Sequence, residues 1–169
     1  MRSSLVAAAA AVAFIVPGQQ LPPEPKVPRA APPQPVPFSH KLHVGQGLSC
    51  KQCHPAPEPG DFATMPKTAF CMGCHASVKK DSPHIAKLAG FHAESKRVPW
   101  APVYRVPDWV SFSHKKHVSV DGVTCETCHG PVQERDALRR ERDISMAACM
   151  DCHRAKKASN ECLLCHDQR

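Results

Sequence analysis

Every cysteine in the chain belongs to a C-x-x-C pair that is followed directly by histidine. The 169 residues include ten cysteines, so the motif C-x-x-C-H occurs five times and no cysteine is left over. This regularity constrains the fold more than any other feature, because five short segments must each present two thiols and one imidazole together. The motifs read CKQCH, CMGCH, CETCH, CMDCH and CLLCH, and they occupy residues 50–54, 71–75, 125–129, 149–153 and 162–166.

Three kinds of chemistry use paired cysteines, and they differ in what they require of the histidine. Structural disulfides give no reason for the fixed spacing or for the histidine. Zinc sites take two pairs for each ion and would leave one of the five pairs stranded. Attachment of c-type haem accounts for every position, because the two thiols bind the porphyrin covalently and the histidine binds its iron. The sequence therefore predicts five c-type haems.

The predicted covalent attachment residues are the two cysteines of each motif, and the predicted proximal iron ligand is its histidine. The cysteines are Cys50, Cys53, Cys71, Cys74, Cys125, Cys128, Cys149, Cys152, Cys162 and Cys165. The histidines are His54, His75, His129, His153 and His166.

The composition leaves little material for a conventional core. Aromatic residues make up 5% of the chain, and the 18 prolines remove backbone donors and interrupt helices and sheets. Five large, flat, apolar porphyrins would fill the interior in place of side chains. We therefore expect mostly coil with short α-helices wrapped around five stacked c-type haems, and little or no β-sheet.

Two similar phrases, FSHKLHV and FSHKKHV, begin at Phe38 and Phe112 and reveal an internal repeat. Each phrase is followed by two C-x-x-C-H motifs, and the second half continues to a fifth. The spacing H-x-x-H lets the two imidazoles of one phrase serve two neighbouring haems as sixth iron ligands. The predicted distal ligands are His40, His43, His114 and His117.

One iron remains without a distal ligand, and four residues are candidates for it. His84 and His92 bracket a predicted short helix, SPHIAKLAGFH, with Ser82 as its N-cap and Pro83 at its first position. Met65 and Met146 each stand just before the second motif of their half, and a thioether ligand would raise the potential of that haem. The fifth distal ligand is thus one of Met146, Met65, His84 and His92.

The remaining segments suggest the domain organisation. An apolar run within residues 1–18 is too short for an ordinary membrane span and predicts a signal peptide or a short N-terminal anchor. Residues 19–37 form a Pro-rich linker, and residues 38–169 form the pentahaem domain. Within it, pseudo-repeats 38–93 and 112–169 are joined by residues 94–111, which hold both tryptophans and the single tyrosine and form either a docking strip or a strap over haem edges.

Charge excludes one class of partner. The formal net charge is +7, but each ferric haem with two ionised propionates contributes about −1, so the basic residues mostly balance propionates. With no nucleic-acid-binding motif in the chain, we expect no nucleic-acid partner. The charged stretch at residues 132–142 predicts a helical, solvated surface.

The phrase FSHKxHV followed by C-x-x-C-H resembles the class III multihaem cytochromes c. Longer phrases, among them MPKTAFCMGCH, VPWAPVYRVPDWVSFSHKKHV and ISMAACMDCHR, resemble the pentahaem subunit of alternative complex III and related quinone oxidoreductases. The resemblance implies that His40, His43, His114 and His117 are distal ligands, and it favours Met146 for the fifth site. It also implies partners: iron–sulfur or quinone-oxidoreductase subunits on one side and a small cytochrome c or similar acceptor on the other.

These observations predict an exported electron-transfer protein without a catalytic site or small-molecule substrate. It would act on the periplasmic side as a subunit of a membrane-associated, quinol-oxidising respiratory or photosynthetic complex. The short N-terminal apolar run leaves open a free periplasmic electron shuttle. A multihaem reductase of a small nitrogen oxyanion is the other alternative, but it requires an iron with an open position, and here the spare histidines and methionines outnumber the irons.

Overall fold

The chain folds into short helices joined by longer irregular segments. The computed structural model describes residues 27–58 and 60–166. Each C-x-x-C-H motif contributes to a helix, because four or five residues suffice for the single turn that carries both cysteines. The elements are α1 (His40–Gly45), α2 (Cys50–Cys53), α3 (Thr68–His75), α4 (Pro83–Ala93), α5 (His114–Val118), α6 (Cys125–His129), the 3-10 turn η1 (Val132–Glu134), α7 (Met146–Ala155) and α8 (Cys162–Cys165).

Within the described residues no strand forms, and Val110 and His166 make an isolated antiparallel bridge. The predicted fold class, mostly coil with short helices and little or no sheet, is confirmed. No helix in this part of the chain has the length and apolarity that crossing a membrane requires. The predicted signal peptide or anchor at residues 1–18 lies outside the described residues, as do residues 19–26 of the predicted linker.

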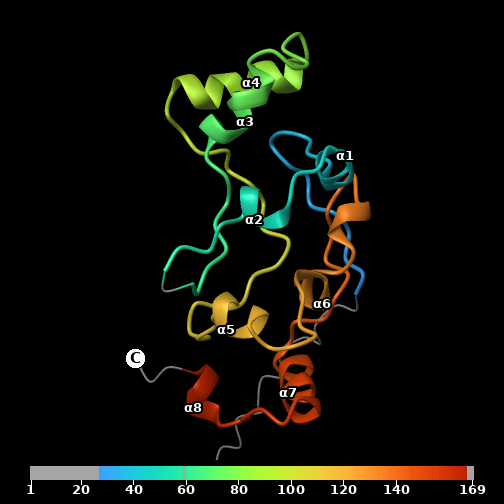
Figure 1. Cartoon of the computed structure of the whole chain (residues 1–169), viewed down its shortest axis with the longest axis vertical. Helices are drawn as coiled ribbons and strands as arrows, with labels where there is room; N and C mark the ends of the chain where they lie inside the picture. The colour runs from blue at the N-terminus through green and yellow to red at the C-terminus, as the bar shows by residue number, and fades with distance from the viewer. Residues whose placement is uncertain (1–26, 59, 167–169) are drawn as a thin grey trace, which may run out of the picture.

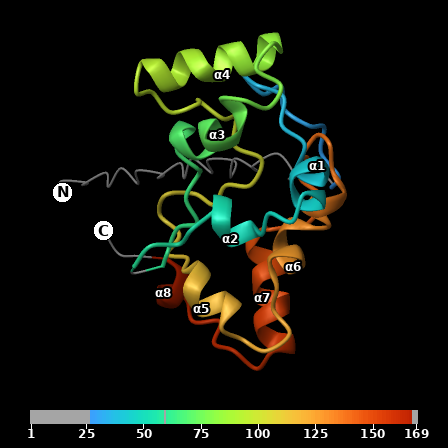
Figure 2. The same cartoon turned by 45° about the horizontal axis from the view of Figure 1, so that its top comes forward.

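The helices are distributed along the long axis of the molecule (Figure 1). Helices α3 and α4 lie at one end, α7 and α8 lie at the other, and α1, α2, α5 and α6 lie between them. In the turned view (Figure 2) α3 and α4 still lie opposite α7 and α8, while α5 lies beside α8. The second motif in the sequence is therefore at one end of the molecule, and the fourth and fifth motifs are at the other.

The side-chain core is small and lies beside α3 and α4. Its buried apolar residues are Val36, Leu88 and Val98, and no large side chain in the described residues is fully buried. This agrees with the low aromatic content, which cannot supply a conventional core. The partly buried residues packed against it are Cys71, Met72, Ile85, Phe91 and Trp100.

The described part of the Pro-rich segment runs along the domain. Val36 belongs to the core, and the Gln34 side chain exchanges two 2.9 Å hydrogen bonds with the backbone of Ala101. The Arg29 amide donates to the Arg140 carbonyl at 2.8 Å. Residues 27–37 form no helix or strand, and they pack on the domain.

The two repeated phrases adopt the same local structure. The Ser39 hydroxyl accepts from the Leu42 amide at the start of α1, and the Ser113 hydroxyl accepts from the Lys116 amide at the start of α5. The phenylalanine of each phrase stacks on the second histidine, with ring centroids 4.2 Å apart in α1 and 4.3 Å in α5. The same Phe meets the first histidine edge-on in both halves. Sequence similarity here reflects a shared three-dimensional unit.

The helix predicted from SPHIAKLAGFH is confirmed as α4, with Ser82 at the N-cap and Pro83 at the first position. The helix predicted over residues 132–142 is wrong beyond the single 3-10 turn at Val132–Glu134. The predicted solvated surface is also wrong in part, because Arg140 is buried. Contacts with residues distant in the sequence hold this segment in an irregular conformation, and a local pattern of charges cannot predict such contacts.

Candidate haem-binding sites

Each motif places its thiols on one side of a short helix. Residues three and four apart in a helix are neighbours on its surface, so the two cysteines and the histidine of a motif are directed toward one region. None of the ten cysteines, all within the described residues, forms a disulfide, and each is exposed or half-buried. Burial raises the pKa of five of these thiols, those of Cys53, Cys71, Cys125, Cys128 and Cys149.

Four of the five motif histidines face a histidine from an H-x-x-H phrase. Within each phrase the first histidine meets the first motif of its half and the second meets the second motif. The centroid separations are 6.4 Å for His40–His54, 6.1 Å for His43–His75, 6.4 Å for His114–His129 and 6.1 Å for His117–His153.

This separation suits a metal ion between two imidazoles. Two nitrogens that bind one ion from opposite sides at about 2 Å lie about 4 Å apart, which puts the ring centroids about 6 Å apart. The structure thus brings together eight of the predicted proximal and distal ligands as four facing pairs. The two histidines of each phrase belong to two different pairs.

The ring orientations are fixed by backbone carbonyls. In six of the eight paired histidines, Nδ1 lies 2.7–3.0 Å from a carbonyl oxygen, so Nδ1 carries the proton and Nε2 is left with its lone pair. Metal-binding histidines use this arrangement, because the hydrogen bond selects the tautomer and makes the ligand more basic. The pairs are His43–Ser39, His54–Thr64, His75–Val78, His114–Asp61, His117–Ser113 and His153–Ser159.

The other two paired histidines are held differently. His40 Nδ1 is buried without a hydrogen-bond partner among the described residues. Burial, followed by the nearby His54 and His43, lowers the pKa of His40 to about 4. Burial, followed by His114 and His54, also lowers the pKa of His129. Both imidazoles are therefore neutral at pH 7, which is the form that binds a metal ion.

The donor set fits haem iron and does not fit the alternatives. A structural zinc ion needs about four protein ligands, and no group of three or more His, Cys, Asp or Glu side chains within the described residues is arranged to hold a metal ion. Two facing imidazoles are what an iron needs when a porphyrin supplies its other four nitrogens. The free thiols beside each pair are the groups that covalent attachment would use.

The fifth motif has no facing histidine among the described residues. His166 is half-buried, and the predicted candidates for its partner lie in different parts of the molecule. His84 and His92 are exposed on α4, at the end of the molecule opposite α8 (Figure 1). Met65 follows Thr64, whose carbonyl bonds His54 of the first motif. Met146 is the first residue of α7, which lies at the same end as α8, and it is 65% exposed.

Sequence reasoning did not identify the residues that orient the ligands. Thr64, Val78, Asp61 and Ser159 act through backbone carbonyls, which carry no signature of residue type. Ser39 and Ser113 had a signal, because both lie inside the repeated phrase and both bond the second histidine from four residues away.

Comparisons with known proteins identify the family of the chain. The profile of the family described as cytochrome c7 and related cytochrome c matches residues 36–94 and 110–167, one stretch in each predicted repeat. The chain is also similar to the menaquinone reductase multiheme cytochrome c subunit of Nitratidesulfovibrio vulgaris. The two are 34% identical over 161 residues, which cover 79% of this chain and 76% of that protein.

Proposed function

The chain belongs to the family of cytochrome c7 and related cytochromes c, and we propose that it binds one c-type haem at each of its five motifs. As a cytochrome c, the chain is an electron carrier, as its sequence predicted. Bound haem supplies the one-electron chemistry of iron. The polypeptide supplies the attachment thiols, the axial ligands and the spacing between sites.

The four facing histidine pairs carry this proposal. Their separations of 6.1–6.4 Å suit axial coordination, and six of the eight rings are oriented by carbonyls so that Nε2 is free. We assign His40, His43, His114 and His117 as distal ligands to the first, second, third and fourth motifs in sequence order. Two strong axial ligands favour a low-spin iron without an open position, which suits electron transfer and disfavours a reductase.

We infer a spatial order of the sites that differs from their order in the sequence. The helices that carry the motifs run along the long axis as α3, α2, α6 and then α7 with α8 (Figure 1). Electrostatic effects between thiols support the same neighbours: after burial, the largest causes of the raised pKa values of Cys71, Cys125 and Cys128 are Cys53, Cys50 and Cys152 respectively. The inferred order is second, first, third, fourth and fifth motif.

For the fifth iron we propose Met146 as the distal ligand to His166. Met146 lies one helical turn before Cys149, whose pKa is raised by burial and then by Cys128 and Cys165. The first turn of α7 is thus close to the fifth motif, whereas His84 and His92 lie at the other end of the molecule. A thioether ligand would give this site a higher potential than a site with two histidines.

We also propose that the chain works in a membrane-associated quinone oxidoreductase complex on the periplasmic side. The similar protein from N. vulgaris is named as a subunit of a menaquinone reductase, which supports this assignment. Iron–sulfur or quinone-oxidoreductase subunits and a small cytochrome c would be its redox partners. The finer resemblance to the pentahaem subunit of alternative complex III belongs to the same proposal.

Haem counting and CO binding test the proposal on the purified, mature protein. The pyridine haemochrome assay should give five haems per chain, and CO should leave the spectrum of the dithionite-reduced protein unchanged because every iron has six ligands. Fewer than five haems would contradict the attachment assignment. CO binding by one haem in five would contradict the complete set of axial ligands and would favour the reductase alternative.

A further inference from the structure

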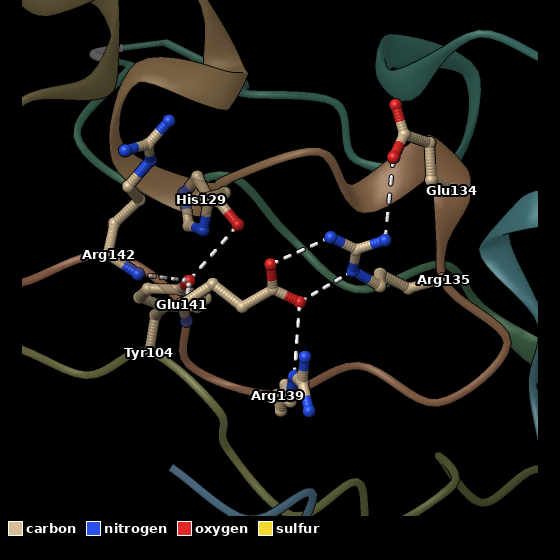
Figure 3. Close-up of polar contacts among 7 residues, drawn as sticks. All are labelled: Tyr104, His129, Glu134, Arg135, Arg139, Glu141 and Arg142. Atoms are coloured by element: carbon tan, nitrogen blue, oxygen red, sulfur yellow. Dashed lines mark hydrogen bonds and ion pairs between the residues drawn. The ribbon is translucent and has the colours of Figure 1, made fainter. Parts of the chain in front are cut away.

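The Tyr104 hydroxyl joins three backbone groups at the third motif (Figure 3). It donates to the His129 carbonyl at 3.0 Å, and it accepts from the amides of Glu141 at 2.8 Å and Arg142 at 3.3 Å. One side chain from the segment between the repeats thus ties the backbone of a motif histidine to residues 141–142. A tyrosine hydroxyl can donate one bond and accept two, so its capacity is fully used.

The Tyr104 ring also contacts the His129 imidazole directly. The ring centroids are 4.7 Å apart and the planes meet at 76°, an edge-to-face arrangement. Among the described residues, His129 Nδ1 has no hydrogen-bond acceptor, unlike the motif histidines His54, His75 and His153. Tyr104 is therefore the side chain that contacts His129, through its ring and through the hydroxyl bond to the His129 carbonyl, but it does not supply the Nδ1 acceptor that a carbonyl gives at those three motifs.

Glu141 is anchored from its other side. Its carboxylate accepts from Arg135 Nε at 2.6 Å and Nη2 at 2.9 Å, and from Arg139 Nε at 3.3 Å (Figure 3). The Glu141 side chain is only 15% exposed, so this two-point pair is less screened by solvent than an ordinary surface ion pair. The Glu141 amide, which donates to the Tyr104 hydroxyl, is consequently held in place.

The backbone beside His129 is packed closely against the same carboxylate residue. Gly130 is buried with φ of +72°, and a Cβ at this position would lie 3.4 Å from the Glu141 Cβ. The chain can therefore bring the His129 carbonyl to Tyr104 only because the next residue is glycine.

The same segment contacts the start of helix α1. The Arg135 carbonyl accepts from the Lys41 amide at 3.1 Å, and Asp136 accepts from the Ser39 hydroxyl at 2.6 Å. Residues 135–142 thus connect helix α1, which carries His40 and His43, to the backbone of His129. This connection lies where the first and third sites adjoin.

We propose that Tyr104 is the positioning residue for His129, the iron ligand at the junction of the two repeats. The Arg135–Glu141 pair holds the backbone partners of Tyr104 in place. The hydroxyl sets the position of the ligand's backbone, and the ring edge sets the orientation of its imidazole. The inference rests on the proposed role of His129 as an iron ligand. It identifies a function for Tyr104 and for residues 135–142 that the motifs alone do not indicate.

The test uses the purified holoprotein with two Tyr104 variants, one control variant and one variant that identifies the third-motif signal. Tyr104→Phe removes the hydroxyl and keeps the ring edge, whereas Tyr104→Leu removes both. The matched control is Arg105→Ala, since the neighbouring Arg105 is exposed and pairs with the exposed Asp108. The readouts are the midpoint potential of each haem by redox titration and the electron paramagnetic resonance (EPR) spectrum of the oxidised protein. The signal from the third motif is identified as the one that His114→Ala abolishes.

We expect Tyr104→Phe to shift the potential of the third-motif haem alone. Tyr104→Leu should also change its EPR signal, because the imidazole is then free to rotate, and Arg105→Ala should change neither readout. Unchanged potentials and spectra in both Tyr104 variants would overturn the proposal, as would equal shifts in all five haems. If the Tyr104 variants fail to fold, Glu141→Gln decides, since it should shift the potential of the third-motif haem and leave the other four unchanged, and no shift at the third-motif haem would overturn the proposal.

A separate variant distinguishes failure of the positioning role from failure of the proposed haem ligation. His129→Ala should convert one haem in five to a form that binds CO after reduction. If all five haems remain six-coordinate in that variant, the ligand assignment is wrong, whatever the Tyr104 variants show. If CO binds but the Tyr104 variants have no effect, the positioning role alone is wrong.

Discussion

The imidazoles of His114 and His129 face each other with their planes 8° from parallel. In the other pairs the angle between the ring planes is 15° for His40–His54, 32° for His117–His153 and 60° for His43–His75. The angle between two axial imidazole planes governs how the iron d orbitals split. Pairs of the same chemical type are therefore not equivalent in this protein.

We predict two classes of low-spin EPR signal from these angles. The first and third motifs, with nearly parallel rings, should give rhombic signals with moderate anisotropy. The second motif, with strongly tilted rings, should give a highly anisotropic signal with a large maximum g value. Spectra of the oxidised protein check this directly, with His114→Ala expected to remove one rhombic signal. A single uniform class across all bis-histidine sites would contradict the prediction.

The hydrogen bonds to Nδ1 predict an order of potentials. A carbonyl acceptor makes an imidazole more basic, which stabilises ferric iron and lowers the potential. Both rings have an acceptor at the second motif and at the fourth. At the first and third motifs only His54 and His114 have one among the described residues. We expect the first and third sites to have higher potentials than the second and fourth.

Potentiometric titration followed by a method that resolves individual haems, such as NMR or EPR, measures this order. In the inferred spatial arrangement, the two higher-potential sites adjoin at the centre of the molecule. Equal potentials at all four sites, or lower values at the first and third, would show that burial and charge outweigh the hydrogen bonds to the ligands.

Met146 and Met65 form a matched pair for testing the fifth site. Met146→Ala should leave the fifth iron with His166 alone, so that CO binds to about one haem in five after reduction and the highest potential in the protein disappears. Met65→Ala removes another exposed thioether near the first motif, where His40 already faces His54. The Met65→Ala variant should therefore bind no CO, like the wild type. The opposite result for the two variants would assign the ligand to Met65.

The sequence predicted the features that depend on residue type and short spacing. Helix α4 follows from Ser82, Pro83 and the helical pattern after them, and the two H-x-x-H phrases, alike in sequence, are alike in local structure. The irregular conformation of residues 132–142 could not be predicted from the sequence. The Arg135–Glu141 pair, the Tyr104 hydroxyl and the contact with α1 join residues that no local pattern links, and they overcome the helical preference of a charged stretch.

Acid should weaken the Arg135–Glu141 connection in a defined pH window. The hydrogen bond from Arg135, followed by that from Arg139 and by both positive charges, lowers the pKa of Glu141 to about 2 against a partial opposing effect of burial. Since the folded-state pKa lies below the ordinary value of 4.5, its contribution to stability is fully present above pH 4.5. That contribution is lost as the pH falls from there through about 2.

Comparison of wild type with Glu141→Gln isolates this effect. Protonation of the axial histidines in acid affects both proteins alike, so the difference between their melting temperatures reports on Glu141. We expect the variant to melt at a lower temperature, with a constant difference at neutral pH that narrows below pH 4.5 and closes near pH 2. A difference that persists unchanged to pH 2 would mean that the substituted amide disturbs packing near Gly130 and that the charge of Glu141 contributes little to stability.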